Sequence, residues 1–167
     1  DVKASRGLGD VYKRQAVAMG AHVVMITSSE KKAADAERLG AHEGLLSTDD
    51  EAMQKQANSF DLLLNTIPAE HDFSCYVNLL KINKTMIVVG IASLKMHSSC
   101  LIFGQKQVVG SLIGGIPETQ EMLDFCAEHN ITSDIELIDI KEINQAYERI
   151  DRGDVIYRVV IDINSLR

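Results

Sequence analysis

The sequence of 167 residues predicts an α/β protein built on a doubly wound parallel sheet. Short runs of Val, Ile and Leu recur along the chain, and such nearly continuous runs are typical of strands buried on both faces. Segments with apolar residues at helical spacing lie between these runs. The alternation indicates parallel strands joined by crossover helices, with helices covering both faces of the sheet.

Five apolar runs are expected to form strands, at residues 22–26, 62–64, 86–89, 108–109 and 159–161. Four apolar stripes are expected on helices: Ala33, Ala36 and Leu39; Phe73, Tyr76, Val77 and Leu80; Met122, Phe125 and Cys126; and Ile143, Ala146, Tyr147 and Ile150. Gly40 is placed to end the first helix, Asp72 to cap the second and Pro117 to begin the third. The length predicts one domain with a core of its own.

Composition excludes several classes of protein. A content of 46% apolar and 25% charged residues is typical of globular proteins and not of disordered or collagen-like chains. No apolar run is long enough for a membrane span, nothing resembles a signal peptide, and a net charge of −7 argues against nucleic acid as a partner. The three cysteines, Cys75, Cys100 and Cys126, are far apart and form no CxxC pair. We therefore expect a cytoplasmic protein.

Small or hydroxyl-bearing residues follow four of the expected strands. They are Thr27-Ser28-Ser29, Asn65-Thr66, Gly90-Ile91-Ala92, and Ser111 with Gly114-Gly115. In parallel sheets the ligand crevice lies at the carboxyl ends of the strands, and such residues let a flat or phosphorylated ligand approach the backbone closely. Loops are commonly rich in the same residue types, so ordinary loop composition is the alternative interpretation.

Residues 16–167 resemble the cofactor domain of zinc-dependent, medium-chain alcohol dehydrogenases. The segments that carry this resemblance are Ala18-Met19-Gly20-Ala21, Ile26-Thr27-Ser28-Ser29, Leu39-Gly40-Ala41, Phe60-Asp61, Leu64-Asn65-Thr66, and the long run from Gly110 to Phe125. The run from Gly110 to Phe125 is specific for the cinnamyl-alcohol-dehydrogenase-like branch of NADP-dependent aldehyde reductases. The resemblance implies a Rossmann-like fold, and it covers about nine tenths of this chain but only about half of a family member.

The resemblance assigns Thr27, Ser28 and Lys32 to the 2′-phosphate of NADP. An NAD-specific enzyme usually has an acid at the end of the second strand, and this chain has Thr27 there. Glu30 is either a ribose acceptor, a first-turn carboxylate favoured by the helix dipole, or the Glu of a capping box begun by Thr27. For Lys31 and Lys32 the alternative to phosphate binding is a solvated helix face.

The remaining cofactor residues are also implied by the resemblance. Asn65, Thr66 and Ile67 are expected to form the adenosine-side and ribose wall, and Gly90, Ile91 and Ala92 to approach the nicotinamide ribose. Ser111, Leu112 and Ile113 are expected to orient the carboxamide through their backbone. Arg158 matches an arginine that reaches the pyrophosphate, unless it is a surface arginine on an edge strand. None of these residues transfers a proton, because the cofactor carries the hydride chemistry.

The family's G-x-G-x-x-G fingerprint is not retained. Its glycines are expected at positions 4, 6 and 9, where this chain has Ala4, Arg6 and Gly9. Asp1–Gln15 is similar to translated adapter read-through, so we expect residues 1–15 to be non-native, Gly7-Leu8-Gly9 to match by accident, and the native domain to begin near Ala16. The sheet is then expected to lack its first strand and the glycine-rich loop, which leaves a gap between neighbouring strands.

No zinc ligands are expected in this chain. The histidines, His22, His42, His71, His97 and His129, show no spacing that places two on one face with a third ligand. The resemblance places the zinc-binding residues of the family in the other domain. The first hypothesis is therefore a fragment of a zinc-dependent NADP alcohol dehydrogenase that by itself catalyses nothing. The alternative is a stand-alone module that binds a nucleotide or a protein without catalysis.

One association is also expected. Gln107–Ile113 resembles the edge strand through which family members pair across a two-fold axis. Because an apolar edge strand needs a partner or a cover, this segment predicts a homodimer.

Overall fold

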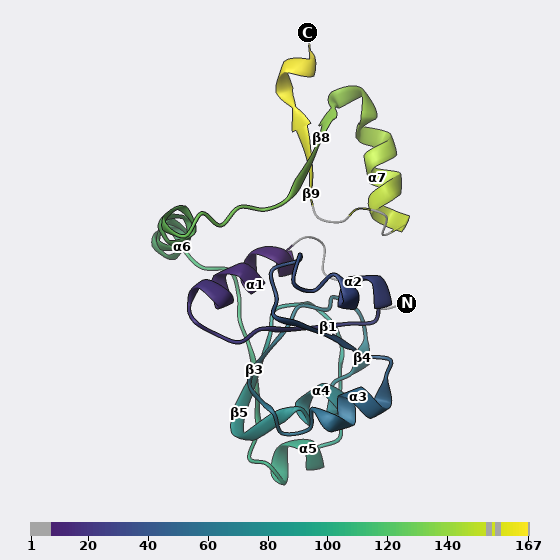
Figure 1. Ribbon diagram of the computed structural model, residues 1–167, viewed down its shortest axis with the longest axis vertical. Coiled ribbons are helices and arrows are strands. Elements are labelled where there is room, and N and C mark those ends of the chain that lie inside the picture. Colours follow the sequence, from purple (N-terminus) through teal and green to yellow (C-terminus); the bar gives the residue numbers. More distant parts are fainter. Residues whose placement is uncertain (1–7, 153–154, 156–157, 167) are drawn as a thin grey trace.

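A computed structural model describes residues 8–152, 155 and 158–166 of the chain (Figure 1). In the first half it contains α1 (Leu8–Ala18), β1 (Val24–Thr27), α2 (Glu30–Ala34), β2 (Glu43–Leu46), α3 (Asp50–Lys55), β3 (Phe60–Asn65), β4 (His71–Asp72), α4 (Ser74–Val77) and β5 (Leu80–Val88). The second half contains β6 (Leu94–Lys95), α5 (Ser99–Ile102), β7 (Gln107–Gly110), α6 (Ile116–Glu128), β8 (Ile135–Asp139), the 3₁₀ turn η1 (Ile140–Glu142), α7 (Ile143–Arg152), β9 (Arg158–Asp162) and the 3₁₀ turn η2 (Ile163–Leu166).

All strand pairs in the described part of the chain are parallel, which confirms the predicted α/β class. The strands form four groups: β1–β2, β3–β5–β7, β4–β6 and β8–β9. Each of the five predicted apolar runs overlaps a strand, although residues 22 and 23 precede β1 and residue 89 follows β5. Parallel neighbours require crossover connections. Helix α3 lies in the connection from β2 to β3, and α4 in the connection from β4 to β5 (Figure 1).

The strands on either side of the predicted gap are β1 and β3. In residues 8–152, β1 pairs with β2 only and β3 pairs with β5 only, and no strand joins these two sheets. β1 and β3 each therefore keep one edge without a strand partner in the described part of the chain. The sequence positions of the fingerprint at Ala4 and Arg6 lie outside the described residues, whereas Gly9 is part of α1.

The core lies where β3 and β5 pack against the short helices α3 and α4. Phe73, Val77, Leu80 and Met86 are fully buried, and Leu45, Met53, Leu63 and Leu79 complete the cluster. Outside this cluster, β2 packs closely on α2: a Cβ on Gly44 would lie 2.1 Å from the backbone oxygen of Ala33. Only a glycine allows α2 and β2 to approach so closely.

Three local expectations are wrong. Leu80 begins β5 instead of lying on a helical stripe, because α4 ends at Val77 and Leu80 pairs with Phe60 of β3. The helix expected over residues 33–39 ends at Ala34 and continues as turns up to Gly40, which has a φ of +81°. The strands are also not buried on both faces: Leu62 of β3 is 57% exposed and lines an open cavity beside this strand.

Four of the described strands escaped the sequence patterns, and two of them, β4 and β6, are only two residues long. β2 and β8 carry glutamates beside their apolar residues, so neither forms the continuous run that marks a buried strand. α3 is six residues long and contributes one buried side chain, Met53, which is too little for a helical stripe.

The C-terminal elements from β8 to η2 form a unit of their own. Figure 1 shows β8, α7 and β9 above the main body, connected to it through α6. Ile138 and Ala146 are buried between β8 and α7, and Arg149 makes two hydrogen bonds with Glu136, at 2.5 and 2.9 Å. Among the described helices, none has the length and apolar character needed to span a membrane.

Candidate functional site

A cavity of about 840 Å³ lies between β1 and β3. It runs along both strands, from Ala21 and Ser59 at their beginnings to Thr27 and Asn65 at their carboxyl ends. The residues between these ends are largely apolar and include Ile26 and Leu63. The cavity therefore coincides with the gap in the sheet, and its polar end is the carboxyl edge at which parallel sheets bind ligands.

Six of the predicted cofactor residues line this one cavity. They are Thr27, Ser28 and Lys32 at the end of β1, and Asn65, Thr66 and Ile67 at the end of β3. The fold thus brings together two segments that are almost forty residues apart in the sequence, as expected for neighbouring exits of a parallel sheet.

The segment after β1 is held by its own hydroxyl groups. Thr27 Oγ1 accepts a hydrogen bond from the Ser29 backbone N–H at 3.2 Å, and Ser29 Oγ accepts one from the Lys32 N–H at 3.4 Å. Ser29 is therefore the N-cap of α2, which corrects the capping box expected to begin at Thr27. Both hydroxyl groups act as acceptors here, so their own hydrogens remain able to donate to a ligand.

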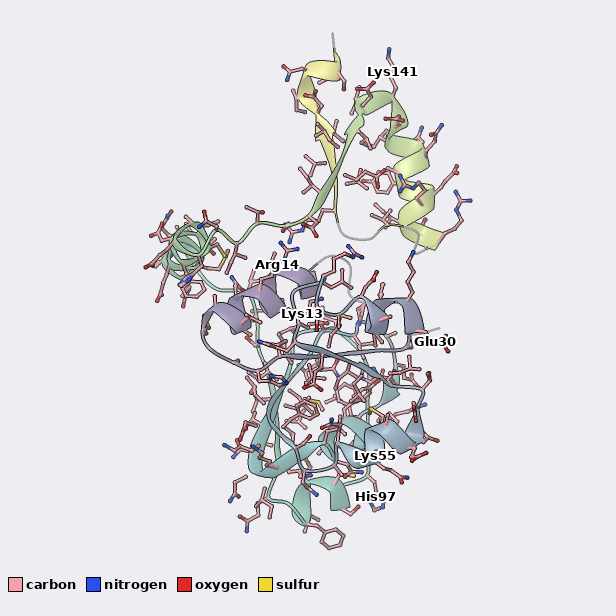
Figure 2. The ribbon with its side chains drawn as sticks, viewed as in Figure 1. Lys13, Arg14, Glu30, Lys55, His97 and Lys141 are labelled. Atoms are coloured by element: carbon pink, nitrogen blue, oxygen red, sulfur yellow. The ribbon has the colours of Figure 1, made fainter. Side chains whose placement is uncertain are left out.

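Glu30 lies in the first turn of α2, as one of its three interpretations expected. Its side chain projects from the outer side of the helix and is not among the residues that line the cavity (Figure 2). In this position it faces solvent rather than the space between β1 and β3.

The cavity wall also contains three carboxylates, each with a basic partner. The pairs are Asp35 with Arg38 at 2.8 Å, Glu43 with His22 at 2.7 Å, and Asp61 with Lys81 at 2.7 Å and Lys84 at 3.2 Å. The hydrogen bonds from the two lysines hold the pKa of Asp61 below its usual range. These carboxylates are therefore already engaged.

Lys31 and Lys32 line the same cavity. In the part of the chain that the structure describes, neither forms an ion pair with a carboxylate. Together with the hydroxyl groups of Thr27, Ser28 and Ser29, they provide a set of donors at one end of the cavity. Such a set suits an anion, and phosphate in particular.

The exit of β3 is organised around the Asn65 side chain, which is 7% exposed. Its Oδ1 accepts a hydrogen bond from the Ile67 N–H at 3.0 Å, and its Nδ2 lies 2.9 Å from His71 Nε2. His71 stacks on Phe73 with ring centroids 4.3 Å apart. Sequence reasoning treated His71 only as a histidine without metal-ligand spacing. The burial of Asn65, which makes a hydrogen-bond partner necessary, is visible only in the structure.

The exit of β5 lies against that of β3. A Cβ on Gly90 would be 2.4 Å from the Ile67 carbonyl oxygen, so the two backbones are in direct contact. Ala92 is half-buried, whereas Ile91 is 95% exposed. None of these three residues lines the cavity itself.

The other predicted residues lie further away. Ser111 directly follows β7 and donates its backbone N–H to Val88 O of β5 at 3.0 Å, whereas Leu112 and Ile113 are 90% and 89% exposed. Arg158 begins β9, is exposed, and pairs with Ile135 of β8 in the separate C-terminal unit. The described residues therefore do not bring Arg158 to the cavity.

The described residues do not fit a zinc ion. Nowhere in residues 8–152, 155 and 158–166 do three His, Cys, Asp or Glu side chains lie close enough together to hold a metal. His22 is engaged with Glu43, and the Nδ1 of His42 accepts the Val23 backbone N–H at 3.0 Å.

Comparisons with known proteins give a consistent result. The sequence profile of the zinc-binding dehydrogenase family matches residues 7–128. Aldehyde reductase YahK of Escherichia coli is 49% identical over 164 residues, which are 96% of this chain and 47% of that protein. The chain thus spans about half the length of the curated relatives it matches.

Two solved structures are also similar. A cinnamyl alcohol dehydrogenase of Sorghum bicolor, SbCAD4, is 38% identical with a TM-score of 0.89, and the match covers 94% of this chain and 45% of that one. The CAD of Helicobacter pylori, solved as a complex with NADP(H), is 35% identical with a TM-score of 0.81, and the match covers 95% and 46% of the two chains.

Proposed function

This chain belongs to the zinc-binding dehydrogenase family, and we propose that it is the cofactor-binding part of an NADP-dependent alcohol dehydrogenase that interconverts aldehydes and alcohols. The observation that carries the proposal is the donor set at the end of β1. Thr27, Ser28 and Lys32 line the cavity where an NAD-specific protein would place a carboxylate. The carboxylates that do line the cavity are already paired.

In this proposal the residues of the chain bind and orient the cofactor, and NADP supplies the hydride when it is bound. Thr27, Ser28 and Lys32 hold the 2′-phosphate. Asn65, Thr66 and Ile67 form the wall on the adenosine side and at the ribose.

The segments after β5 and β7 serve the other end of the cofactor. Gly90, Ile91 and Ala92 approach the nicotinamide ribose, and the backbone of Ser111, Leu112 and Ile113 orients the carboxamide. Arg158 reaches the pyrophosphate in the whole protein. Because the described residues provide no zinc ligands, no catalytic step through a metal is assigned to this chain.

We further propose that the native domain runs from Ala16 to Arg167 and that the whole protein is a cytoplasmic homodimer. The edge of the β3–β5–β7 sheet supports the dimer, because β7 has a strand neighbour on one side only in the described part of the chain. Sequencing the 5′ end of the transcript tests the boundary near Ala16.

Charge reversal at Lys32 tests the cofactor assignment. In a full-length protein that contains this chain as its second half, we expect NADPH to bind more tightly than NADH. Lys32→Glu should weaken NADPH binding by about ten- to a hundredfold, because it removes one charge-assisted contact with the phosphate. The affinity for NADH, which lacks this phosphate, should change little. The difference in affinity between NADPH and NADH should therefore become smaller.

Lys141→Glu is the matched control. Lys141 is exposed on η1 in the C-terminal unit, far from the cavity (Figure 2), so the same change of charge should leave both dissociation constants unaltered. Fluorescence titration with NADPH and NADH measures the dissociation constants of the wild type and both variants. Equal affinity for NADPH and NADH before mutation would contradict the assignment.

A further inference from the structure

A chain of three hydrogen bonds connects the end of β3 to β4. The Ile67 N–H lies 3.0 Å from Asn65 Oδ1, Asn65 Nδ2 lies 2.9 Å from His71 Nε2, and His71 Nδ1 lies 2.7 Å from the Ala69 carbonyl oxygen. The residues involved are buried or half-buried, so water competes little for these groups.

The groups at the two ends of this chain fix the direction of every bond in it. A backbone N–H can only donate, so the atom of Asn65 that faces Ile67 is the oxygen, and the amide nitrogen faces His71. A carbonyl can only accept, so the proton of His71 is on Nδ1 toward Ala69. Nε2 is then bare and accepts from Asn65. One tautomer of His71, Nδ1–H, satisfies all three contacts.

His71 itself is firmly placed. Its ring stacks on Phe73, which is fully buried, and meets the edge of Tyr76 with centroids 5.6 Å apart. Its backbone pairs with Leu94 of β6. These contacts fix the position of the His71 ring, and the ring in turn orients the Asn65 amide.

Asn65 in turn contacts both loops at this edge of the sheet. Its backbone oxygen accepts from the N–H groups of Val89 and Gly90, at 3.0 and 3.4 Å, and its side chain holds Ile67. Gly90 packs directly on the Ile67 carbonyl. The loop that begins at Gly90 ends at β6, whose Leu94 pairs with His71. One end of that loop is therefore bonded to Asn65, and the other end pairs with His71.

We propose that His71 is a positioning residue, which acts through the Asn65 amide to set the shape of the Asn65–Ile67 and Gly90–Ala92 segments. It does not touch the cofactor. This inference rests on the proposed function in one respect, which is the assignment of these two segments to NADP binding. The geometry of the three bonds is independent of any ligand.

The first test is the tautomer of His71 in the 167-residue chain labelled with ¹⁵N. Long-range proton–nitrogen correlation spectra distinguish a protonated Nδ1 from a protonated Nε2, and the signals of His71 are assigned by their loss in His71→Phe. We expect the proton on Nδ1. The signals can equally be assigned by their loss in His71→Gln, and a proton on Nε2 would overturn the proposal.

The second test is hydrogen exchange at the Ile67 amide. His71→Phe keeps a ring to stack on Phe73 but removes the acceptor, and it should accelerate Ile67 exchange by about three- to tenfold. His71→Gln offers a side-chain oxygen to Asn65 and should restore much of the protection. A purely structural role for the ring predicts the opposite order, with Phe closer to the wild type than Gln.

Two controls separate this effect from general destabilisation. The Ala52 amide, bonded to Asp49 Oδ1 at 3.0 Å on α3, should exchange at an unchanged rate in His71→Phe. His97→Phe makes the same substitution at an exposed histidine (Figure 2) whose ring bonds Ser99 instead of Asn65, and it should not affect Ile67. Unchanged Ile67 exchange in His71→Phe would overturn the proposal.

Cofactor titration in the full-length protein completes the set. His71→Phe should weaken NADPH binding by about three- to tenfold, and His71→Gln should recover most of that loss. If the wild type binds no NADPH, the proposed function fails while the tautomer and exchange results stand. If the wild type binds NADPH and Ile67 exchange is insensitive to His71, the positioning role fails alone.

Discussion

Lys106 is a buried cation whose replacement by methionine should destabilise the fold measurably. It lies directly before β7 and is 9% exposed. Its ammonium group donates hydrogen bonds to Asn58 Oδ1 at 3.1 Å, to the Val77 carbonyl at 3.1 Å and to the Asn78 carbonyl at 3.3 Å. Lys106 thus joins the start of β7 to the end of α4 and to the turn before β3.

The expected cost follows from what Lys106→Met leaves behind. The methionine fills the space of the aliphatic stem but satisfies none of the three acceptors. The Asn78 carbonyl keeps its bond from the Asn58 N–H at 3.1 Å, so most of the loss falls on the Val77 carbonyl and the Asn58 amide. A hydrogen bond to a charged donor contributes about 1.5–3 kcal/mol to stability. The variant no longer has to bury an ammonium group, and this gain offsets part of the loss of the hydrogen bonds. We expect a net loss of about 2–4 kcal/mol.

Urea unfolding followed by circular dichroism measures this loss, since the chain contains no tryptophan. Lys55→Met is the matched control. Lys55 lies in an exposed pair with Glu51 on α3, and its replacement should change the free energy of unfolding by no more than about 0.5 kcal/mol. A Lys106→Met variant as stable as the wild type would show that the three bonds contribute nothing net.

The pH dependence provides a second check on Lys106. Burial lowers the pKa of its ammonium group, so the unfolded chain binds the proton more tightly than the folded chain. Between the lowered pKa and the ordinary lysine value, the unfolded state therefore holds more protons, and stability rises with pH. The advantage of the wild type over Lys106→Met should grow across this alkaline range. An advantage that shrinks as the pH rises would refute the reasoning.

Two further outcomes are expected. Leu112→Glu places a charge on a 90% exposed residue of the Gln107–Ile113 segment, so it should convert the proposed dimer of the full-length protein to a monomer in light scattering. A monodisperse wild-type monomer at micromolar concentration would contradict the proposed dimer. The 167-residue chain with zinc, NADPH and an aromatic aldehyde should show no loss of cofactor absorbance above the control without protein, because no zinc-ligand group is found among its described residues, and steady turnover abolished by a chelator would reveal a metal site.

The sequence was informative where a structural element imposes one continuous pattern. The apolar runs located β1, β3, β5, β7 and β9, because a strand in a parallel sheet needs apolar side chains in succession. The same rule failed for β2 and β8, where glutamates at exposed positions interrupt the pattern. Periodicity located α6 and α7, which are 13 and 10 residues long, but overestimated α2, which has only five.

The candidate site divides in a similar way. A polar residue after an apolar strand can be placed at the carboxyl edge of the sheet from sequence alone, and Thr27 and Asn65 lie there. The partner of each polar group cannot be placed in this way. Ser29 rather than Thr27 caps α2, and His71 holds Asn65, because these contacts depend on the path of loops whose turns leave no periodic signal.

The cavity between β1 and β3 has two parts with different physical origins. Along most of its length it is bounded by apolar residues such as Ile26 and Leu63 and by strand edges that have no strand partner in residues 8–152, which is the environment of a missing strand. Only its carboxyl end carries the donors of Thr27, Ser28 and Lys32. Its volume of about 840 Å³ is therefore no measure of the ligand. A strand that filled the apolar part would leave the donor set in place, and it would confine a cofactor to the edge where Asn65 and His71 shape the wall.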